Sequence, residues 1–95
     1  MGPFVIVSLH ALSRYRERIE TGGAGTDDEI TVKILHAFRH SRPVQLRSKR
    51  ERISKLLKHG TQTSYHQSQK MVLVIADGSV ISVYEYFPDR WEAVK

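Results

Sequence analysis

Three basic residues, His10, Arg14 and Arg18, follow one another at four-residue spacing near the N-terminus. Residues four apart lie on the same side of an α-helix, one turn above the other. An imidazole can move a proton near neutral pH, and a guanidinium can grip a phosphate through two hydrogen bonds. His10 and Arg14 could therefore act together on a phosphodiester. The alternative is a solvated face on which Glu17 pairs with Arg14 or Arg18.

A second group of polar residues lies in the C-terminal half of the chain. Tyr65 and His66 fall on one expected strand, and Ser82, Tyr84 and Tyr86 alternate along another. Alternate residues share one face of a strand, so the last three would face a cleft or solvent. Tyrosines in such a place could stack on bases or donate to a phosphate. Ordinary cross-strand aromatic pairing is the alternative.

Positive charge is concentrated in residues 42–58, where seven basic residues accompany Glu51 alone. The segment therefore carries +6, seven minus one, whereas the whole chain carries +5. Such a cluster attracts polyanions through counterion release, whatever their sequence. The candidate nucleic-acid-binding residues are Arg47, Lys49, Arg50, Arg52, Lys55 and Lys58. A solvated helix face without a partner is the alternative.

The five histidines do not suggest a metal site. His36 and His40 have the i, i+4 spacing of some zinc ligands, but no glutamate follows His36 as it does in the HExxH pattern. We expect this pair at an exposed helix end, where His40 favours the negative end of the dipole. No cofactor is expected.

The first half of the chain is expected to form a strand and two helices. Residues 4–7 read as a buried strand, and Ser8 offers an N-cap to a helix that ends before the glycines of residues 21–25. Its apolar positions are Leu9, Leu12, Tyr15 or Arg16, and Ile19. Thr26 and Glu29 form a capping box for a second helix, which Pro43 requires to end by His40 or Ser41. Its apolar stripe is Ile30, Ile34, Ala37 and Phe38.

The second half is expected to begin with a short strand at residues 44–46 and a third helix at residues 49–59. Ser48 and Glu51 repeat the capping-box pattern, and Gly60 ends the helix. The helix would bury Ile53, Leu56 and Leu57 and expose its cationic residues.

Three strands are expected after this helix, at residues 63–67, 70–76 and 79–87. Asp77-Gly78 is the type I′ hairpin signal between the last two strands. In the last strand, Ile81 and Val83 would point into the core, with Val80 on the side of the tyrosines. These elements predict an α+β fold, with an N-terminal strand and two to three helices packed on one face of a C-terminal antiparallel β-meander.

Composition limits the classes of protein. Ninety-five residues with 40% apolar content are enough for one core, so residues 1–95 should form a single domain. The chain has no cysteine, which excludes disulfides and thiolate metal sites and suits a reducing cytoplasm. The longest apolar runs, residues 4–7 and 71–76, are far shorter than the ~20 residues of a membrane span. Monomer and homodimer both stay open.

Residues 8–18 (SLHALSRYRER), in a chain that ends in a hairpin at residues 72–84, resemble the opening of small bacterial and phage domains of the barnase, EndoU, colicin and RelE-like ribonuclease superfamily. The resemblance covers the layout of most of the chain and the motif of these residues. It implies metal-independent RNA cleavage by attack of the ribose 2′-hydroxyl on the adjacent phosphate. His10 would be the acid or base and Arg14 the phosphate clamp, and the complementary groups on the sheet would be His66 with Tyr84 or Ser82.

Residues 26–59 are longer than the link usual in that superfamily. This insertion fits a substrate-docking device in an enzyme, or a binding protein that kept the scaffold without the chemistry. The sequence therefore predicts a small, basic protein directed at RNA or DNA. One hypothesis is a toxin-type, metal-independent endoribonuclease. The other is a non-catalytic phage or plasmid regulator that holds DNA, RNA or an acidic protein surface through residues 49–59. A protein inhibitor or regulatory partner is also expected.

Overall fold

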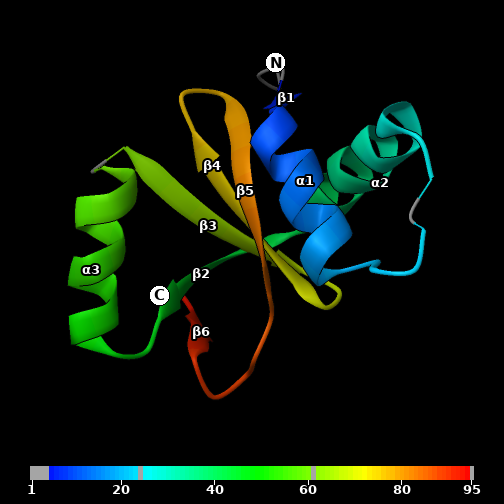
Figure 1. The fold of residues 1–95 in the computed structure, drawn as a ribbon. Coiled ribbons are helices and arrows are strands. Elements are labelled where there is room, and N and C mark those ends of the chain that lie inside the picture. The colour runs from blue at the N-terminus through cyan, green and yellow to red at the C-terminus, as the bar shows by residue number, and fades with distance from the viewer. Residues whose placement is uncertain (1–4, 24, 61, 95) are drawn as a thin grey trace.

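The computed structural model describes residues 5–23, 25–60 and 62–94 and has the predicted α+β fold. The six strands form one mixed sheet in the order β1-β5-β4-β3-β2-β6. Two helices lie on one side of this sheet and the third lies on the other (Figure 1). The short β1 pairs with β5 in parallel, and the other described pairings are antiparallel. The elements are β1 Ile6–Val7, α1 Leu9–Arg18, α2 Asp27–Arg39, β2 Arg42–Leu46, α3 Lys49–His59, β3 Thr63–Ser68, β4 Met71–Ala76, β5 Ser79–Glu85 and β6 Trp91–Ala93.

The three helices begin at the capping residues that the sequence predicted. The side chain of Ser8 accepts a hydrogen bond from the backbone of Ala11 at the start of α1. Thr26 and Glu29 form both hydrogen bonds of a capping box at α2, and the hydroxyl of Ser48 accepts the first-turn bond at α3. Gly60 ends α3 with a φ of +88°, a conformation that favours glycine.

The hairpin between β4 and β5 contains the predicted turn and one feature that was not predicted. Asp77 and Gly78 both have positive φ, as a type I′ turn requires. The register then shifts, since Val74 lies opposite Ser82 but Ile75 lies opposite Val80. This bulge adds one residue to β5 and reverses the alternation before Ser82. The predicted faces of Val80 and Ile81 were therefore wrong, because Val80 is fully buried and Ile81 is only half-buried.

The helices α1 and α2 cover one face of the sheet and form the larger core. That core contains Ala11, Leu12, Tyr15, Ile19, Ile30, Ile34, Ala37, Met71, Leu73, Val80 and Val83. The predicted stripe of α2 is confirmed, whereas Leu9 of α1 is 79% exposed and Ala11 takes the buried place. The N-terminal strand is shorter and less buried than expected, with Ile6 67% exposed. Phe4 of that predicted strand lies outside the described residues.

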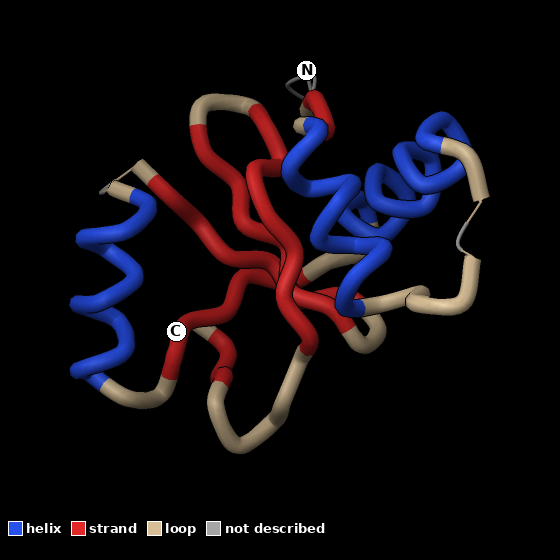
Figure 2. Tube along the Cα trace, in the orientation of Figure 1, coloured by secondary structure: helices blue, strands red, loops and turns tan. Residues whose placement is uncertain are grey.

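The opposite face of the sheet carries a smaller cluster with aromatic residues, and α3 stands beside it (Figure 2). The cluster consists of Val44, Leu46, Val72 and Trp91, with Tyr65, Tyr84 and Tyr86 packed against it. Trp91 belongs to β6, a strand that was not predicted and that pairs with β2. We expected all helices on one face, and the position of α3 corrects this.

The orientation of α3 also differs from the prediction. None of its residues is buried, and Ile53 and Leu57 are 52% and 83% exposed. The physical reason is that the sheet offers two hydrogen-bond acceptors to α3 beside its apolar cluster. Arg52 donates to the carbonyl of Leu46, and Lys55 donates to the hydroxyl of Tyr84. Arg52 and Lys55, rather than Ile53 and Leu57, therefore face the sheet.

None of the described helices is long and apolar enough to cross a membrane. Within residues 5–23, 25–60 and 62–94, no three of the His, Asp and Glu side chains are grouped as metal ligands would be. The rings of His36 and His40 lie 4.7 Å apart between centroids, at the exposed end of α2.

Candidate functional site

Four side chains from three elements meet on the α3 side of the sheet. Tyr84 of β5 is the centre, because its hydroxyl lies 3.0 Å from Lys55 Nζ and 3.1 Å from His59 Nε2. The Arg18 guanidinium carbon and Lys55 Nζ lie 4.8 Å and 4.3 Å from the centre of the Tyr84 ring, within the range of cation–π contacts. We call Arg18, Lys55, His59 and Tyr84 the cation–tyrosine cluster.

Arg18 reaches this cluster because of the open edge of β5. The partner β1 pairs only with Ser79 and Val80, so no described strand continues along the edge beyond them. Arg18 is at the last turn of α1, which packs on β5, and its Nη1 donates to the carbonyl oxygen of Val83 at 2.8 Å. The guanidinium thus satisfies an edge carbonyl that would otherwise have no strand partner, and this bond holds it beside Tyr84.

Lys55 and His59 reach the same hydroxyl because they lie one turn apart on α3. The carbonyl oxygen of His59 accepts a hydrogen bond from the Thr63 hydroxyl at the start of β3, which fixes the end of the helix. At the other end, Ser48 begins α3 only two residues after β2. The strand ends before and after α3 therefore set which side of the helix faces Tyr84.

Burial and the neighbouring cations shift the pKa values of two members of the cluster, Tyr84 and His59. Burial opposes ionisation of Tyr84, yet the hydrogen bond from Lys55 and the charges of Lys55, Lys58 and Arg18 together lower its pKa below the ordinary value. Burial is also the main cause that lowers the pKa of His59, and the charges of Lys58, Lys55 and His10 add to it. His59 is therefore neutral at pH 7, and its imidazole can accept a proton there.

An open pocket of about 240 Å³ lies against the cluster. It is lined by Arg18, Lys55, Tyr84, Glu85, Phe87, Arg90 and Trp91. Arg90 also forms an ion pair with Glu51 of α3. Three cationic side chains and one carboxylate thus line the pocket, and this excess of positive charge suits a phosphate. We call it the phosphate pocket.

The structure does not bring together all the residues predicted to act on a phosphodiester. His66 lies opposite Leu73 on the face that α2 covers, with its ring 5.3 Å from that of Phe38. Tyr84 lies opposite Val72 on the other face. The sheet thus separates His66 from Tyr84. Burial lowers the pKa of His66, as expected for an imidazole beneath a helix.

The two predicted residues on α1 have different surroundings. Arg14 Nη1 lies 2.7 Å from Glu17 Oε1, which is the alternative that the sequence left open. His10 is exposed on the first turn of α1, and its charge is close enough to lower the pKa of His59. His10 therefore belongs to the surroundings of the cluster, whereas Arg14 is paired on the helix surface.

The hydroxyl-bearing residues predicted on the sheet also lie in different surroundings. Ser82 is only 3% exposed, so its hydroxyl lies within the packed sheet. Tyr86 shares the aromatic face with Tyr84, and its hydroxyl accepts a hydrogen bond from Arg42. The ring of Tyr65 packs against that of Trp91, with centroids 5.4 Å apart. Cross-strand aromatic packing therefore accounts for part of this group, and Tyr84 alone of the predicted groups on the sheet joins the cluster.

The six predicted nucleic-acid-binding residues fall into two sets. Lys49, Arg50 and Lys58 are exposed on α3, and no ion pair is found for them among the described residues. Arg47 and Arg52 lie 3.4 Å and 3.9 Å from carboxylate oxygens of Glu92, which offsets part of their charge. Lys55 is the member of the six that contacts Tyr84.

His59 and Arg18 were not predicted as site residues from the sequence. The signal for His59 was its four-residue spacing from Lys55, which places both on one side of a helix. The signal for Arg18 was its place on the line of His10 and Arg14. Neither spacing shows which tyrosine the helices approach.

Comparison of the chain with protein-family models, curated proteins and solved structures found no significant match. The resemblance to the ribonuclease superfamily therefore stays a hypothesis that rests on residues 8–18 and on the order of the elements.

Proposed function

We propose that this protein binds single-stranded RNA through the phosphate backbone, with the cation–tyrosine cluster as the centre of the interface. The observation that carries the proposal is the convergence of Arg18, Lys55 and His59 on Tyr84 from two helices on either side of it. Cations beside an aromatic ring are what a single strand needs, because the cations hold phosphates and the ring offers a stacking surface.

The orientation of α3 favours a single strand over a duplex. A helix that reads the major groove presents its polar residues outward to base edges. In α3, Lys55 and His59 face the sheet, while Ile53 and Leu57 are exposed. Arg18 and Lys55 thus line a pocket that a flexible strand can enter, whereas Lys49, Arg50 and Lys58 are exposed on α3.

The binding test is a titration of a labelled, mixed-sequence RNA 12-mer by fluorescence anisotropy at several salt concentrations. Lys55→Gln is expected to weaken binding about tenfold, as loss of one charged hydrogen-bonding group does. It should also reduce the salt slope by about 0.7, the value for one phosphate contact on a single strand. Arg18→Gln should act in the same direction.

Two variants with the same change of charge serve as controls. Arg39→Gln removes an exposed cation on α2, and Lys49→Gln removes one on the outer side of α3. Both should change the affinity by less than about threefold. If Lys49→Gln weakens binding as much as Lys55→Gln, the RNA follows the outer side of α3 and the proposed site is wrong. A DNA 12-mer of the same sequence tests the choice of RNA.

A second candidate function is metal-independent cleavage of the bound RNA. The neutral His59 imidazole beside a Tyr84 hydroxyl of lowered pKa favours it, since these groups can accept and donate a proton near neutral pH. Compared with the roles implied by the family resemblance, His59 takes the place of His66, and Arg18 takes the place of Arg14.

The proposed reaction is a transesterification. The ribose 2′-oxygen forms a bond to the adjacent phosphorus, and its proton passes to His59. The bond from phosphorus to the 5′-oxygen breaks, and this oxygen takes the proton of the Tyr84 hydroxyl. Lys55 and Arg18 stabilise the charge that develops on the phosphate oxygens. The products are a 2′,3′-cyclic phosphate and a 5′-hydroxyl, and His59 returns its proton to Tyr84.

The test of cleavage is incubation with RNA in EDTA, followed by analysis of the new ends. Cyclic phosphate ends and resistance of a 2′-deoxy-substituted RNA are expected. His59→Gln and Tyr84→Phe should each reduce the rate at least about 100-fold, the usual contribution of a positioned acid or base. His66→Gln should leave the rate unchanged. RNA that stays intact removes the cleavage hypothesis and leaves RNA binding in place.

A further inference from the structure

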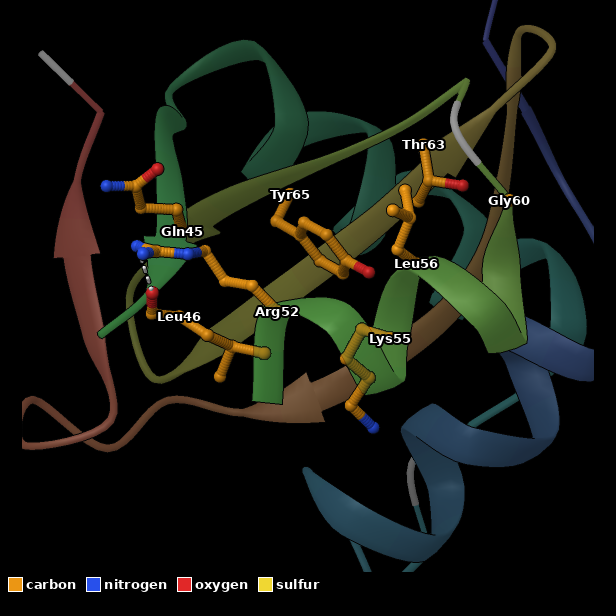
Figure 3. A pocket seen from close by; sticks show the side chains of 8 residues that line it. All are labelled: Gln45, Leu46, Arg52, Lys55, Leu56, Gly60, Thr63 and Tyr65. Carbon is orange, nitrogen blue, oxygen red and sulfur yellow. Dashed lines mark hydrogen bonds between the residues drawn. The ribbon is translucent and has the colours of Figure 1, made fainter. Parts of the chain in front are cut away.

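A second cavity, of about 120 Å³, lies between α3 and the sheet on the other side of Lys55 from the phosphate pocket. It is lined by Gln45, Leu46, Arg52, Lys55, Leu56, Gly60, Thr63 and Tyr65 (Figure 3). Lys55 is the residue that lines both cavities. In Figure 3 its side chain is directed away from the ring of Tyr65.

The interior of this cavity is apolar and aromatic. Leu46, which is 2% exposed, lines it from the sheet, and Leu56 lines it from α3. Tyr65 contributes a half-buried ring that rests against Trp91 at a centroid distance of 5.4 Å. A planar ligand can therefore contact Leu56 and the aromatic ring at once.

Polar groups stand at the rim of the cavity. Gln45 Nε2 donates to Glu92 Oε2 at 2.8 Å, so its amide is held in place. Among the hydrogen bonds of residues 5–23, 25–60 and 62–94, none involves Gln45 Oε1 or the Tyr65 hydroxyl. A ligand with donors and acceptors around a flat apolar ring would meet both groups.

We propose that this cavity binds one unpaired base of an RNA strand whose neighbouring phosphate lies in the phosphate pocket. The inference rests on the proposed RNA binding and adds a base-binding subsite to it. A nucleotide combines a planar ring bearing polar edges with a phosphate a few bonds away, and the two cavities offer these environments on either side of Lys55. The base must be unpaired, because bases within a duplex are stacked and cannot enter a pocket.

The experiment compares an RNA hexamer with an abasic hexamer that has the same riboses and phosphates, by fluorescence anisotropy. The hexamer with bases should bind about tenfold more tightly, as expected when one base stacks on an aromatic ring. Tyr65→Leu removes the ring and keeps apolar bulk, so it should abolish this difference and leave the affinity for the abasic hexamer unchanged.

A second variant fills the cavity instead of removing its aromatic ring. Leu56→Trp places a large side chain at the mouth of the cavity and should reduce the affinity of the base-containing hexamer to the abasic level. Leu57→Trp is the matched control, since Leu57 is the next residue and is 83% exposed. It should keep the tenfold difference. Circular dichroism of each variant verifies that the fold is intact.

The chain has a single tryptophan, Trp91, which provides an independent measurement. Trp91 lines the phosphate pocket and packs on Tyr65. Adenosine monophosphate should change its fluorescence strongly in the wild-type protein. In Leu56→Trp, compared with its own ligand-free spectrum, it should produce only the small change that ribose 5-phosphate produces in both proteins.

The failures of the two proposals differ. Equal, salt-dependent affinities for the two hexamers would overturn the base subsite and leave backbone binding standing. A base preference that survives both Tyr65→Leu and Leu56→Trp would also overturn it, because the base would then bind elsewhere. If neither hexamer binds with salt-dependent affinity, RNA binding itself is wrong.

Discussion

The two faces of the sheet differ in the side chains that the helices turn toward them. On the face covered by α1 and α2, apolar side chains meet apolar side chains, and Ile30, Ile34 and Leu73 are fully buried. On the other face, α3 turns cations toward tyrosines and leaves Ile53 and Leu57 exposed. The apolar contacts of the first face stabilise the fold.

The second face gives up stability that an apolar helix contact would provide. A buried Leu or Ile contributes roughly 1.5–3 kcal/mol, and α3 forgoes this at Ile53 and Leu57. The contacts that hold α3 are instead hydrogen bonds and cation–π contacts around Tyr84. Sites that bind ligands often have polar contacts where apolar packing would be more stable. The first face therefore stabilises the fold, and the second carries the surface proposed to bind RNA.

The largest expected effect tests how much the face covered by α1 and α2 stabilises the fold. Leu73→Ala removes a fully buried side chain from the core under α1 and α2 and should destabilise the protein by about 3 kcal/mol. Leu57→Ala, the control on α3, should change the free energy of unfolding by less than about 0.5 kcal/mol. Urea denaturation measures both. A cost of more than about 1.5 kcal/mol at Leu57 would mean that the outer side of α3 is packed in solution.

The next effect tests how α3 is held. Tyr84→Phe keeps the ring and removes the hydroxyl that Lys55 and His59 contact. Amide hydrogen exchange in α3 should become about tenfold faster, because a hydrogen bond to a charged group stabilises by about 1.5–3 kcal/mol when it is well formed. Exchange in α2 should not change. Equal acceleration in both helices would show that the two faces are not independent.

The pH dependence of stability is a further difference, because each face has one partly buried histidine. Burial lowers the pKa of His66 under α2 below the value of about 6.5 in an unfolded chain. The folded state therefore binds fewer protons than the unfolded state in the window between these pKa values. Its stability is fully present above about pH 6.5 and is lost as the pH falls through the folded pKa.

Thermal denaturation at pH 7.5 and pH 5 checks this prediction. The wild-type protein should lose thermal stability on acidification, and His66→Gln should lose less, since the glutamine does not titrate. His59→Gln should also reduce the loss, because the pKa of His59 is lowered in the same direction, first by burial and then by Lys58, Lys55 and His10. A pH dependence that is unchanged in both variants would show that neither histidine is buried in its neutral form.

Local signals in the sequence were sufficient for most of the fold. Ser8, Thr26 and Ser48 mark helix starts because the first backbone N–H groups of any helix need acceptors. Asp77-Gly78 marks the hairpin because both residues tolerate positive φ. These requirements are short-range, so they can be seen in a single chain.

The parts that were not predicted depend on contacts between distant residues. The bulge at Val74 and Ile75 shifts the register by one residue, and nothing in the alternation of β5 reveals it. The rotation of α3 depends on acceptors at Leu46 and Tyr84, which lie on two strands far apart in the sequence. Tyr84 and Lys55 could therefore be selected by residue type, whereas their pairing with Arg18 and His59 needed the fold.

The smallest expected effect tests the charge of the residues that line the phosphate pocket. Glu85 is exposed and is the one carboxylate that lines the phosphate pocket, so it would repel a phosphate bound there. Glu85→Gln should tighten RNA binding about twofold to threefold, the size of a single exposed charge interaction, and leave stability unchanged. Asp77→Asn makes the same change of charge at the opposite end of β5 and keeps a residue that tolerates positive φ. If the two variants tighten binding equally, the gain comes from net charge, and the phosphate does not lie beside Glu85. A gain confined to Glu85→Gln, measured by anisotropy at low salt, would place the phosphate on the α3 side of the sheet.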